Sequence, residues 1–240
     1  MTLDPTIFAP GPARDSRFTV EDRWIDCVNL PAGHVEKQVE FLHRQMNEEV
    51  DSLESSARNL CDFPDADWEV RMCLARQCAD ETRHSRMFRA LMEKRGGHVG
   101  KYPVLNFQYR IITQFDSLSA RLAIQNRSFE AGGIDAITSG IARALEDGDE
   151  ELAELYESQC ADEISHVRFA NEWIRTLTEK SPTELVRIGQ ALRKASMAFR
   201  AVMGEEGTEG VNYPADRKGR LEAGFTPEEV DLTANLLSAR

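Results

Sequence analysis

Two copies of one short motif carry the residues of this sequence that are best suited to chemistry. The sequence reads QCADETRH at 77–84 and QCADEISH at 159–166, so six of the eight positions are identical at an offset of 82 residues. Each copy contains one Glu-x-x-His pair: Glu81 with His84, and Glu163 with His166. Residues three apart share one face of a helix, so each pair can direct a carboxylate and an imidazole toward the same metal ion.

The apolar residues around both pairs predict that they face a protein core. At about 100° per residue, each pair falls within the apolar stripe of its own helix. The stripes are formed by Val70, Leu74, Phe88 and Leu91 around the first pair, and by Leu152, Ala170 and Trp173 around the second. A buried carboxylate that lacks a partner is costly, so four ionisable groups in one core need partners. Two divalent metal ions would provide them.

Glu130 is predicted to add a third carboxylate from another helix. It lies about as far before the turn at 147–148 as Glu163 lies after it. It also shares an apolar stripe with Ile134 and Ile137. We therefore expect Glu130 at the same depth of the core as the two pairs.

The first helix offers two candidates for the fourth carboxylate, Glu48 and Glu49. The repeat spacing favours Glu48, because it precedes Glu130 by the same 82 residues. Helical phase favours Glu49, because Glu48 points roughly 130° away from the centre of the apolar stripe. We choose Glu49, since a loop that differs by one residue is easily accommodated and a reversed side chain is not. By the same test Glu40, His43 and Glu54 point away, and His43 is expected at the surface.

The predicted site therefore holds two metal ions. Its ligands are Glu49, Glu81, His84, Glu130, Glu163 and His166. One Glu from each of two helices and a Glu-x-x-His pair from each of two others is the di-iron or di-manganese carboxylate arrangement. Mixed nitrogen and oxygen ligands suit iron, with manganese as the alternative. Four carboxylates neutralise two divalent ions, so the formal charge of −12 would become −8. Asp80 and Asp162 are expected to accept the free ring N–H of a ligating histidine.

Helical periodicity predicts the elements that position these residues. Helices are expected over about 34–62, 66–95, 116–147, 149–179 and 181–204, with a short last helix in 226–240. Short turns join the first to the second helix and the third to the fourth, whereas residues 96–115 form a long connection with few helix signals. No segment shows sustained strand alternation. The sequence thus predicts an all-α four-helix bundle with one long crossover connection and a C-terminal fifth helix. Residues 1–33 form an N-terminal arm, 34–204 the helical domain and 205–240 a tail.

Several stretches resemble a known protein family. They are NEEVDSLE and FPDADWE within 47–69, ADETRH and ADEISHVRF around the two pairs, and FEAGGID at 129–135. Over about 40–175 the chain resembles the ferritin-like di-iron carboxylate superfamily, and most closely a bacterial ferritin-like family of unknown function. The resemblance implies a metal-binding ferritin-like bundle with oxygen chemistry, and it aligns Glu49 with the first-helix acid. That family has His-Glu before this acid, where this chain has Asn47-Glu48.

The resulting functional hypothesis is a di-iron oxidoreductase, an oxidase or oxygenase that activates O₂ on a small organic substrate. The alternatives are a non-catalytic iron-binding or ferroxidase-type protein, and a hydroxylase that modifies tRNA. The formal charge of −12 on 240 residues argues against nucleic acid as a partner, because phosphate binding needs a basic surface. No apolar run reaches the 18–20 residues or so of a membrane span. Five cysteines with no disulfide framework favour the cytoplasm. The sequence leaves a homodimer open.

Gly132 and Gly133 follow Glu130 directly, although glycine is costly inside a helix. They predict either a kink or π-bulge beside the metal ions, or close packing of a neighbouring helix, and the sequence leaves both open. Tyr156 is expected to fill the core rather than to serve the site.

Overall fold

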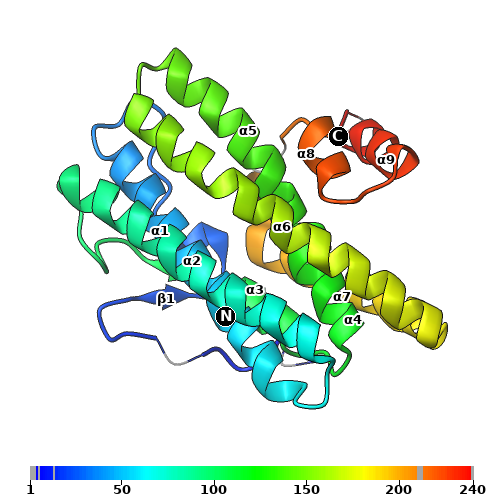
Figure 1. Ribbon diagram of the computed structural model, residues 1–240. Coiled ribbons are helices and arrows are strands. Elements are labelled where there is room, and N and C mark those ends of the chain that lie inside the picture. Colours follow the sequence, from blue (N-terminus) through cyan, green and yellow to red (C-terminus); the bar gives the residue numbers. More distant parts are fainter. Residues whose placement is uncertain (1–3, 5, 13, 210–212, 239–240) are drawn as a thin grey trace. The chain divides into compact units, whose positions relative to one another are not determined.

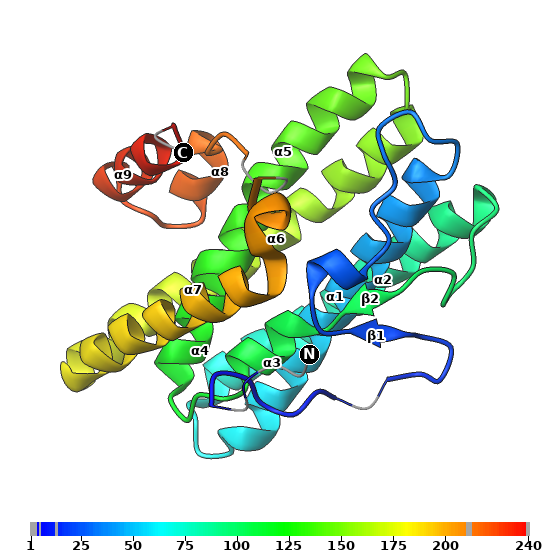
Figure 2. The ribbon, with the colours of Figure 1, turned by 180° about the vertical axis from the view of Figure 1, so that it is seen from behind.

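The protein is an all-α helical bundle, as predicted (Figure 1). The computed structural model describes residues 4, 6–12, 14–209 and 213–238, so parts of the predicted arm and tail lie outside the described residues. Within these ranges no helix is long and apolar enough to cross a membrane. Strands in the described chain are limited to β1 (Val20–Glu21) and β2 (Val104–Leu105), which pair in parallel (Figure 2).

Four long helical stretches follow the order that periodicity predicts. They are α1 (Lys37–Asp62), α2 (Trp68–Lys94), the succession of α4 (Leu118–Ile124), the π-helical segment η2 (Gln125–Glu130) and α5 (Ala131–Glu146), and α6 (Glu150–Lys180). Two of these helices, α2 and α6, have an aspartate at the N-cap position. Asp67 accepts the backbone N–H of Glu69, and Asp149 accepts that of Leu152. Such caps satisfy N–H groups that have no partner inside the helix, which is why these helices begin here.

The C-terminal part contains α7 (Thr183–Glu209), α8 (Arg217–Glu222) and α9 (Pro227–Ser238). The regular path of α7 is interrupted at Gly204, where φ is 64°, and the sequence places its end at the same residue. Three short elements are not predicted from the sequence: α8, the helix α3 (Phe107–Ile112) within the long connection, and the 3₁₀ turn η1 (Trp24–Asp26) in the arm. Elements of fewer than two turns show no periodicity, and they depend on tertiary packing rather than on propensity.

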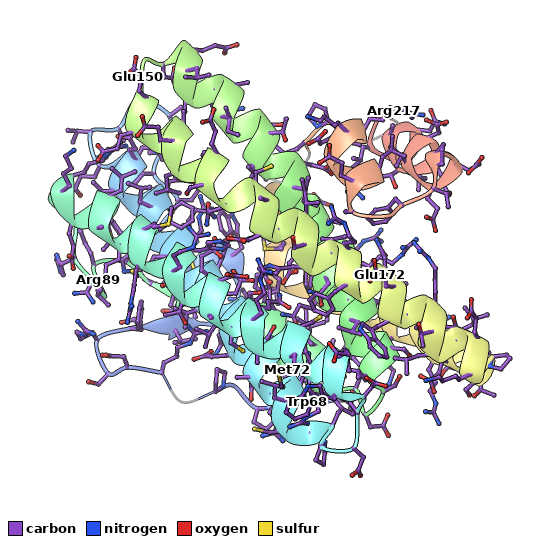
Figure 3. The ribbon with its side chains drawn as sticks, in the orientation of Figure 1. Trp68, Met72, Arg89, Glu150, Glu172 and Arg217 are labelled. Atoms are coloured by element: carbon purple, nitrogen blue, oxygen red, sulfur yellow. The ribbon has the colours of Figure 1, made fainter. Side chains whose placement is uncertain are left out.

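The chain forms two compact units, and the first consists of Met1–Ala66, Leu74–Asp116 and Arg193–Thr208. Its centre is an antiparallel pair of helices, α1 and most of α2. The hydroxyl of Ser85 donates to the backbone O of Met46, and the thiol of Cys78 lies 3.7 Å from the backbone O of Leu53. The opposite face of α2 is exposed, as the labelled side chain of Arg89 illustrates (Figure 3).

The second unit consists of Asp67–Cys73, Ser117–Leu192 and Glu209–Arg240. Its centre is the antiparallel pair of α5 and α6. A Cβ at Gly140 would lie 2.8 Å from the ring of Tyr156, so these helices approach closely here. Tyr156 is buried in this contact, which agrees with its predicted role as core filling. The C-terminal helices α8 and α9 pack on the same pair through a cluster that includes Ile134, Val167 and Phe225.

His43 is fully buried, so its predicted surface position is wrong. Its Nε2 accepts the backbone N–H of Gly100 at 2.9 Å, and the rings of Phe18 and Tyr102 lie within 6 Å of its ring. The N-terminal arm and the connection after α2 therefore cover this face of α1, which helical phase alone does not reveal. Burial, more than the nearby charge of His98, lowers the pKa of His43 from 6.5 to about 4.

Candidate metal centre

The first unit brings Glu49, Glu81 and His84 together. One ligand atom from each lies within 4.8 Å of those of the other two, so this group could hold a metal ion. The Nδ1 atom of His84 lies 3.0 Å from Oε2 of Glu81 and 3.5 Å from Oε2 of Glu49. Glu81 and His84 are buried, and Glu49 retains partial exposure. We call these three residues the first triad.

The carboxylate of Glu81 is fixed by two neighbours. Its Oε1 atom accepts the hydroxyl of Ser52 at 2.9 Å and the amide of Gln77 at 3.3 Å. Its Oε2 atom faces His84. One oxygen is thus held by the protein, and the other is directed toward the remaining residues of the triad.

A guanidinium lies on the far side of the His84 ring. Nη2 of Arg83 is 3.1 Å from Nε2 of His84. Arginine only donates hydrogen bonds, so Nε2 is the acceptor. The ring hydrogen is therefore on Nδ1, from which it donates to Glu81.

The geometry distinguishes Glu49 from Glu48. Glu48 accepts a hydrogen bond from Gln45 on its own helix, and burial raises its pKa. Only Glu49 of these two belongs to the group around His84. Asn47 turns instead to the N-terminal arm and the long connection, where it accepts from Arg14 and donates to the backbone O of Leu105. Helical phase thus identifies the carboxylate that lies beside His84.

The second unit brings Glu130, Glu163 and His166 together. Their ligand atoms also lie within 4.8 Å of one another, and all three residues are buried. Nδ1 of His166 is 3.9 Å from Oε2 of Glu163, which is beyond hydrogen-bond distance. The amide of Asn126 donates to Oε2 of Glu130 at 2.7 Å. We call Glu130, Glu163 and His166 the second triad.

Glu130 is the last residue of the π-helical segment η2. The N–H of the next residue, Ala131, reaches the backbone O of Asn126, five residues back. The hydroxyl of Ser128 bonds in addition to the backbone O of Ala123. This segment agrees with the π-bulge beside Glu130 that Gly132 and Gly133 predict, although it precedes these glycines. The alternative prediction, close packing of a neighbouring helix, is wrong: among the described residues, no atom beyond the adjacent residues and the backbone of the same helix lies within 4 Å of a Cβ at either glycine.

Each triad has a donor set that fits a divalent cation. Two carboxylates and one neutral imidazole carry two negative charges, which one divalent ion would balance. Oxygen and imidazole nitrogen together suit iron, manganese and similar metals. Burying a charged carboxylate without an opposite charge is unfavourable, and each triad places two carboxylates close together. Both triads can therefore bind metal on chemical grounds.

Sequence reasoning missed the side chains that hold these ligands. Ser52, Gln77 and Asn126 each donate to a ligand carboxylate, and Arg83 contacts a ligand imidazole. A signal existed for Gln77, because it opens the repeated octapeptide. A second signal existed for Asn126, because it precedes Glu130 by one helical turn and therefore lies on the same helix face. The expected contacts of Asp80 and Asp162 with ligand histidines stay predictions.

A comparison with known protein families assigns the chain to one of them. Residues 7–231 match the family described as "Protein of unknown function (DUF455)", and the chain belongs to this family. No curated protein matches the chain.

Proposed function

We propose that this member of the DUF455 family is a ferritin-like dinuclear metal protein that activates O₂ to oxidise a small organic substrate. One observation carries the proposal: each unit gathers two glutamates and one histidine within 4.8 Å, around one copy of the repeated octapeptide. A surface arrangement of charges would not place such residues in the interior of both units. Each triad would supply the ligands of one metal ion.

Iron is the metal we propose first, with manganese as the alternative. The bound metal ions would supply the electrons that reduce O₂. The chain would supply the geometry. Ser52 and Gln77 would hold one oxygen of Glu81 while the other meets the metal, and Asn126 would orient Glu130 in the same way. Burial of the ligands would keep bulk water from the site.

Metal loading under anaerobic conditions tests this proposal. We expect metal-free protein to bind two Fe(II) ions per chain, and then to consume O₂ with a change in its optical spectrum. Oxidation of iron without any oxidised organic product would favour the ferroxidase-type alternative. Failure to bind Fe(II) or Mn(II) would refute the dinuclear centre.

A pair of adjacent variants provides a matched control. Glu49→Gln should lower the amount of bound metal, because it removes a charged ligand from the first triad. Glu48→Gln should leave metal binding unchanged, because Glu48 turns to Gln45 on its own helix. Equal losses in both variants would show that metal binding does not depend on the triad geometry.

A further inference from the structure

We propose that the C-terminal helices hold Glu130 in the second triad, and that Arg127 is the positioning residue through which they do so. We call residues 216–238, which include α8 and α9, the C-terminal cap. The cap, the second triad and Arg127 all belong to the second unit. This inference rests on the proposed function, because it concerns how a ligand of the second triad is kept in place. It starts from the position of Glu130 at the end of the π-helical segment η2.

The π-helical form of η2 bears on the direction of the Glu130 side chain. In a π-helix each backbone hydrogen bond spans five residues rather than four, and such segments are rare. If η2 returned to α-helical bonding, one of its flanks would shift by one residue, which corresponds to a rotation of about 100°. A rotation on the α5 side would turn the carboxylate of Glu130 away from Glu163 and His166. The second triad therefore depends on contacts that keep η2 in its π-helical form.

Arg127 connects η2 to the C-terminal cap. It is the third residue of η2 and lies three residues before Glu130. Its guanidinium donates to the carboxylate of Glu229 on α9 and to the side-chain oxygen of Asn171 on α6. It also lies over the ring of Phe225, with Cζ 4.5 Å from the ring centre, where a cation is attracted to the aromatic face. Three neighbours thus fix the position of this side chain.

The cap also contacts the helix on the other side of Glu130. Arg220 of α8 pairs with Asp135, which lies five residues after Glu130 on α5. The hydroxyl of Thr138 donates to the carboxylate of Asp216 at 2.8 Å. The cap thus contacts η2 before Glu130 and α5 after it. A rotation of α5 relative to η2 would break one of these two sets of contacts, so the docked cap opposes it.

Other contacts attach the cap to α6 without involving η2. Nε of Arg168 donates to the backbone O of Glu222 at 2.8 Å, and Arg175 donates to the backbone O of Gly224. Apolar residues of the cap also pack on the α5–α6 pair. These contacts should remain when Arg127 is replaced. Its replacement therefore separates the support of η2 from the attachment of the cap.

Titration of metal-free protein with Mn(II), followed by calorimetry and by the electron paramagnetic resonance of free Mn(II), tests the inference. Arg127→Gln should weaken the binding of one of the two Mn(II) ions by about fivefold, a size typical of a contact that acts through another residue. It should leave the other ion unchanged. In a His166→Ala background, where the second triad lacks a ligand, Arg127→Gln should have no effect on the remaining Mn(II).

Replacements at the other end of the contact keep the sequence of η2 intact. Glu229→Gln should weaken the same Mn(II) ion. The double variant Arg127→Gln/Glu229→Gln should bind it no more weakly than Arg127→Gln, because Glu229 acts through Arg127. Arg127→Lys keeps a charge beside Glu229 and should lose less affinity than Arg127→Gln. Full additivity of the two Gln replacements would refute a shared pathway through Arg127.

Arg217→Gln is the matched control. Arg217 of α8 pairs with Asp231 of α9, and both side chains are exposed, so this replacement removes the same charge from a contact within the cap. Its isotherm should equal that of the wild type. An Arg127→Gln isotherm equal to that of Arg217→Gln would overturn the inference. A wild type that binds neither Mn(II) nor Fe(II) would overturn the proposed function as well.

Amide hydrogen exchange, measured by mass spectrometry, gives a readout that does not depend on activity. Linkage is reciprocal, so Mn(II) should slow exchange in α8 and α9 of the wild type if the cap supports a ligand of the metal ion. In Arg127→Gln this slowing should be lost from the cap, whereas the slowing in α6 should persist. Equal slowing in the cap of the wild type and of Arg127→Gln would refute the role of Arg127 while leaving the proposed function intact.

Discussion

The buried ion pair between Asp135 and Arg220 should anchor the C-terminal helices to α5 within the second unit. Nε and Nη2 of Arg220 donate to the carboxylate of Asp135 at 2.9 and 2.6 Å, and both side chains are less than a tenth exposed. The carboxylate also accepts the backbone N–H of Asp216 at 2.8 Å. Replacement of Arg220 would remove both guanidinium donors from the buried carboxylate of Asp135. The backbone N–H of Asp216 would remain as a donor to it.

Arg220→Met should therefore lower the free energy of unfolding by about 3–5 kcal/mol, the usual cost of removing one partner of a buried ion pair. Urea denaturation followed by far-ultraviolet circular dichroism measures this loss. The double variant Arg220→Met/Asp135→Asn should recover more than half of it, because the unpaired charge is then gone. This recovery separates the effect of the charge from that of lost packing against Phe225.

Lys218→Met is the control on the same helix. Lys218 is highly exposed and lies 3.9 Å from Glu222, so solvent screens this pair. Its replacement should hardly change the free energy of unfolding. If Arg220→Met were no more costly than Lys218→Met, the buried pair would contribute nothing to the anchoring of the tail, and the reasoning would be wrong.

Three further predictions follow from single contacts. Burial lowers the pKa of His43 to about 4, so between pH 6.5 and 4 the unfolded chain binds a proton that the folded chain does not, and stability falls with falling pH. His43→Gln should remove up to roughly 3 kcal/mol of this pH dependence from the free energy of unfolding. Asn126→Ala, which removes the donor to Glu130, should weaken Mn(II) binding about 10–100-fold in calorimetry. Gly100→Ala should cost at least about 2 kcal/mol in urea denaturation, because φ is 83° and a Cβ would overlap a backbone oxygen of the arm. Gly33→Ala, with φ of 85° and open space around it, should cost less.

The long helices and the two triads could be predicted from the sequence because local patterns determine them. Apolar periodicity located α1, α2, α5 and α6, and it indicated that the two Glu-x-x-His pairs face inward. It failed for Glu40 and His43, which it directs away from the core and which are buried. The octapeptide repeat then singled out the two Glu-x-x-His pairs from the other polar residues. Each of these inferences needs only residues that are near one another along the chain.

Contacts between distant segments could not be predicted in this way. His43 is buried because the N-terminal arm and the connection after α2 cover it, and its hydrogen-bond donor, Gly100, lies 57 positions later in the chain. Arg14 of the N-terminal arm reaches Asn47, Asp51 and Glu54 on α1, although nothing in its surrounding sequence marks it. Burial raises the pKa of Asp51 to about 7 against the opposing charge of Arg14. Such polar contacts depend on where the arm crosses the helix, which has no periodic signature.

The choice between Glu48 and Glu49 shows why helical phase is the stronger guide. In both hairpins the second helix places its glutamate equally far from its first residue, since Trp68 begins α2 and Glu150 begins α6. The first helices differ. α5 continues to Glu146, 16 residues beyond Glu130, whereas α1 continues to Asp62, 13 residues beyond Glu49. The turn between α5 and α6 is two residues shorter than that between α1 and α2, which leaves a net difference of one residue. The repeat therefore extends over α2 and α6 but not over the first helix of each hairpin. The repeat spacing has to be counted across the turn, over which the two hairpins differ by a net one residue, and it therefore points to Glu48. Helical phase is counted within α1 alone, so the turn does not affect it, and it points to Glu49.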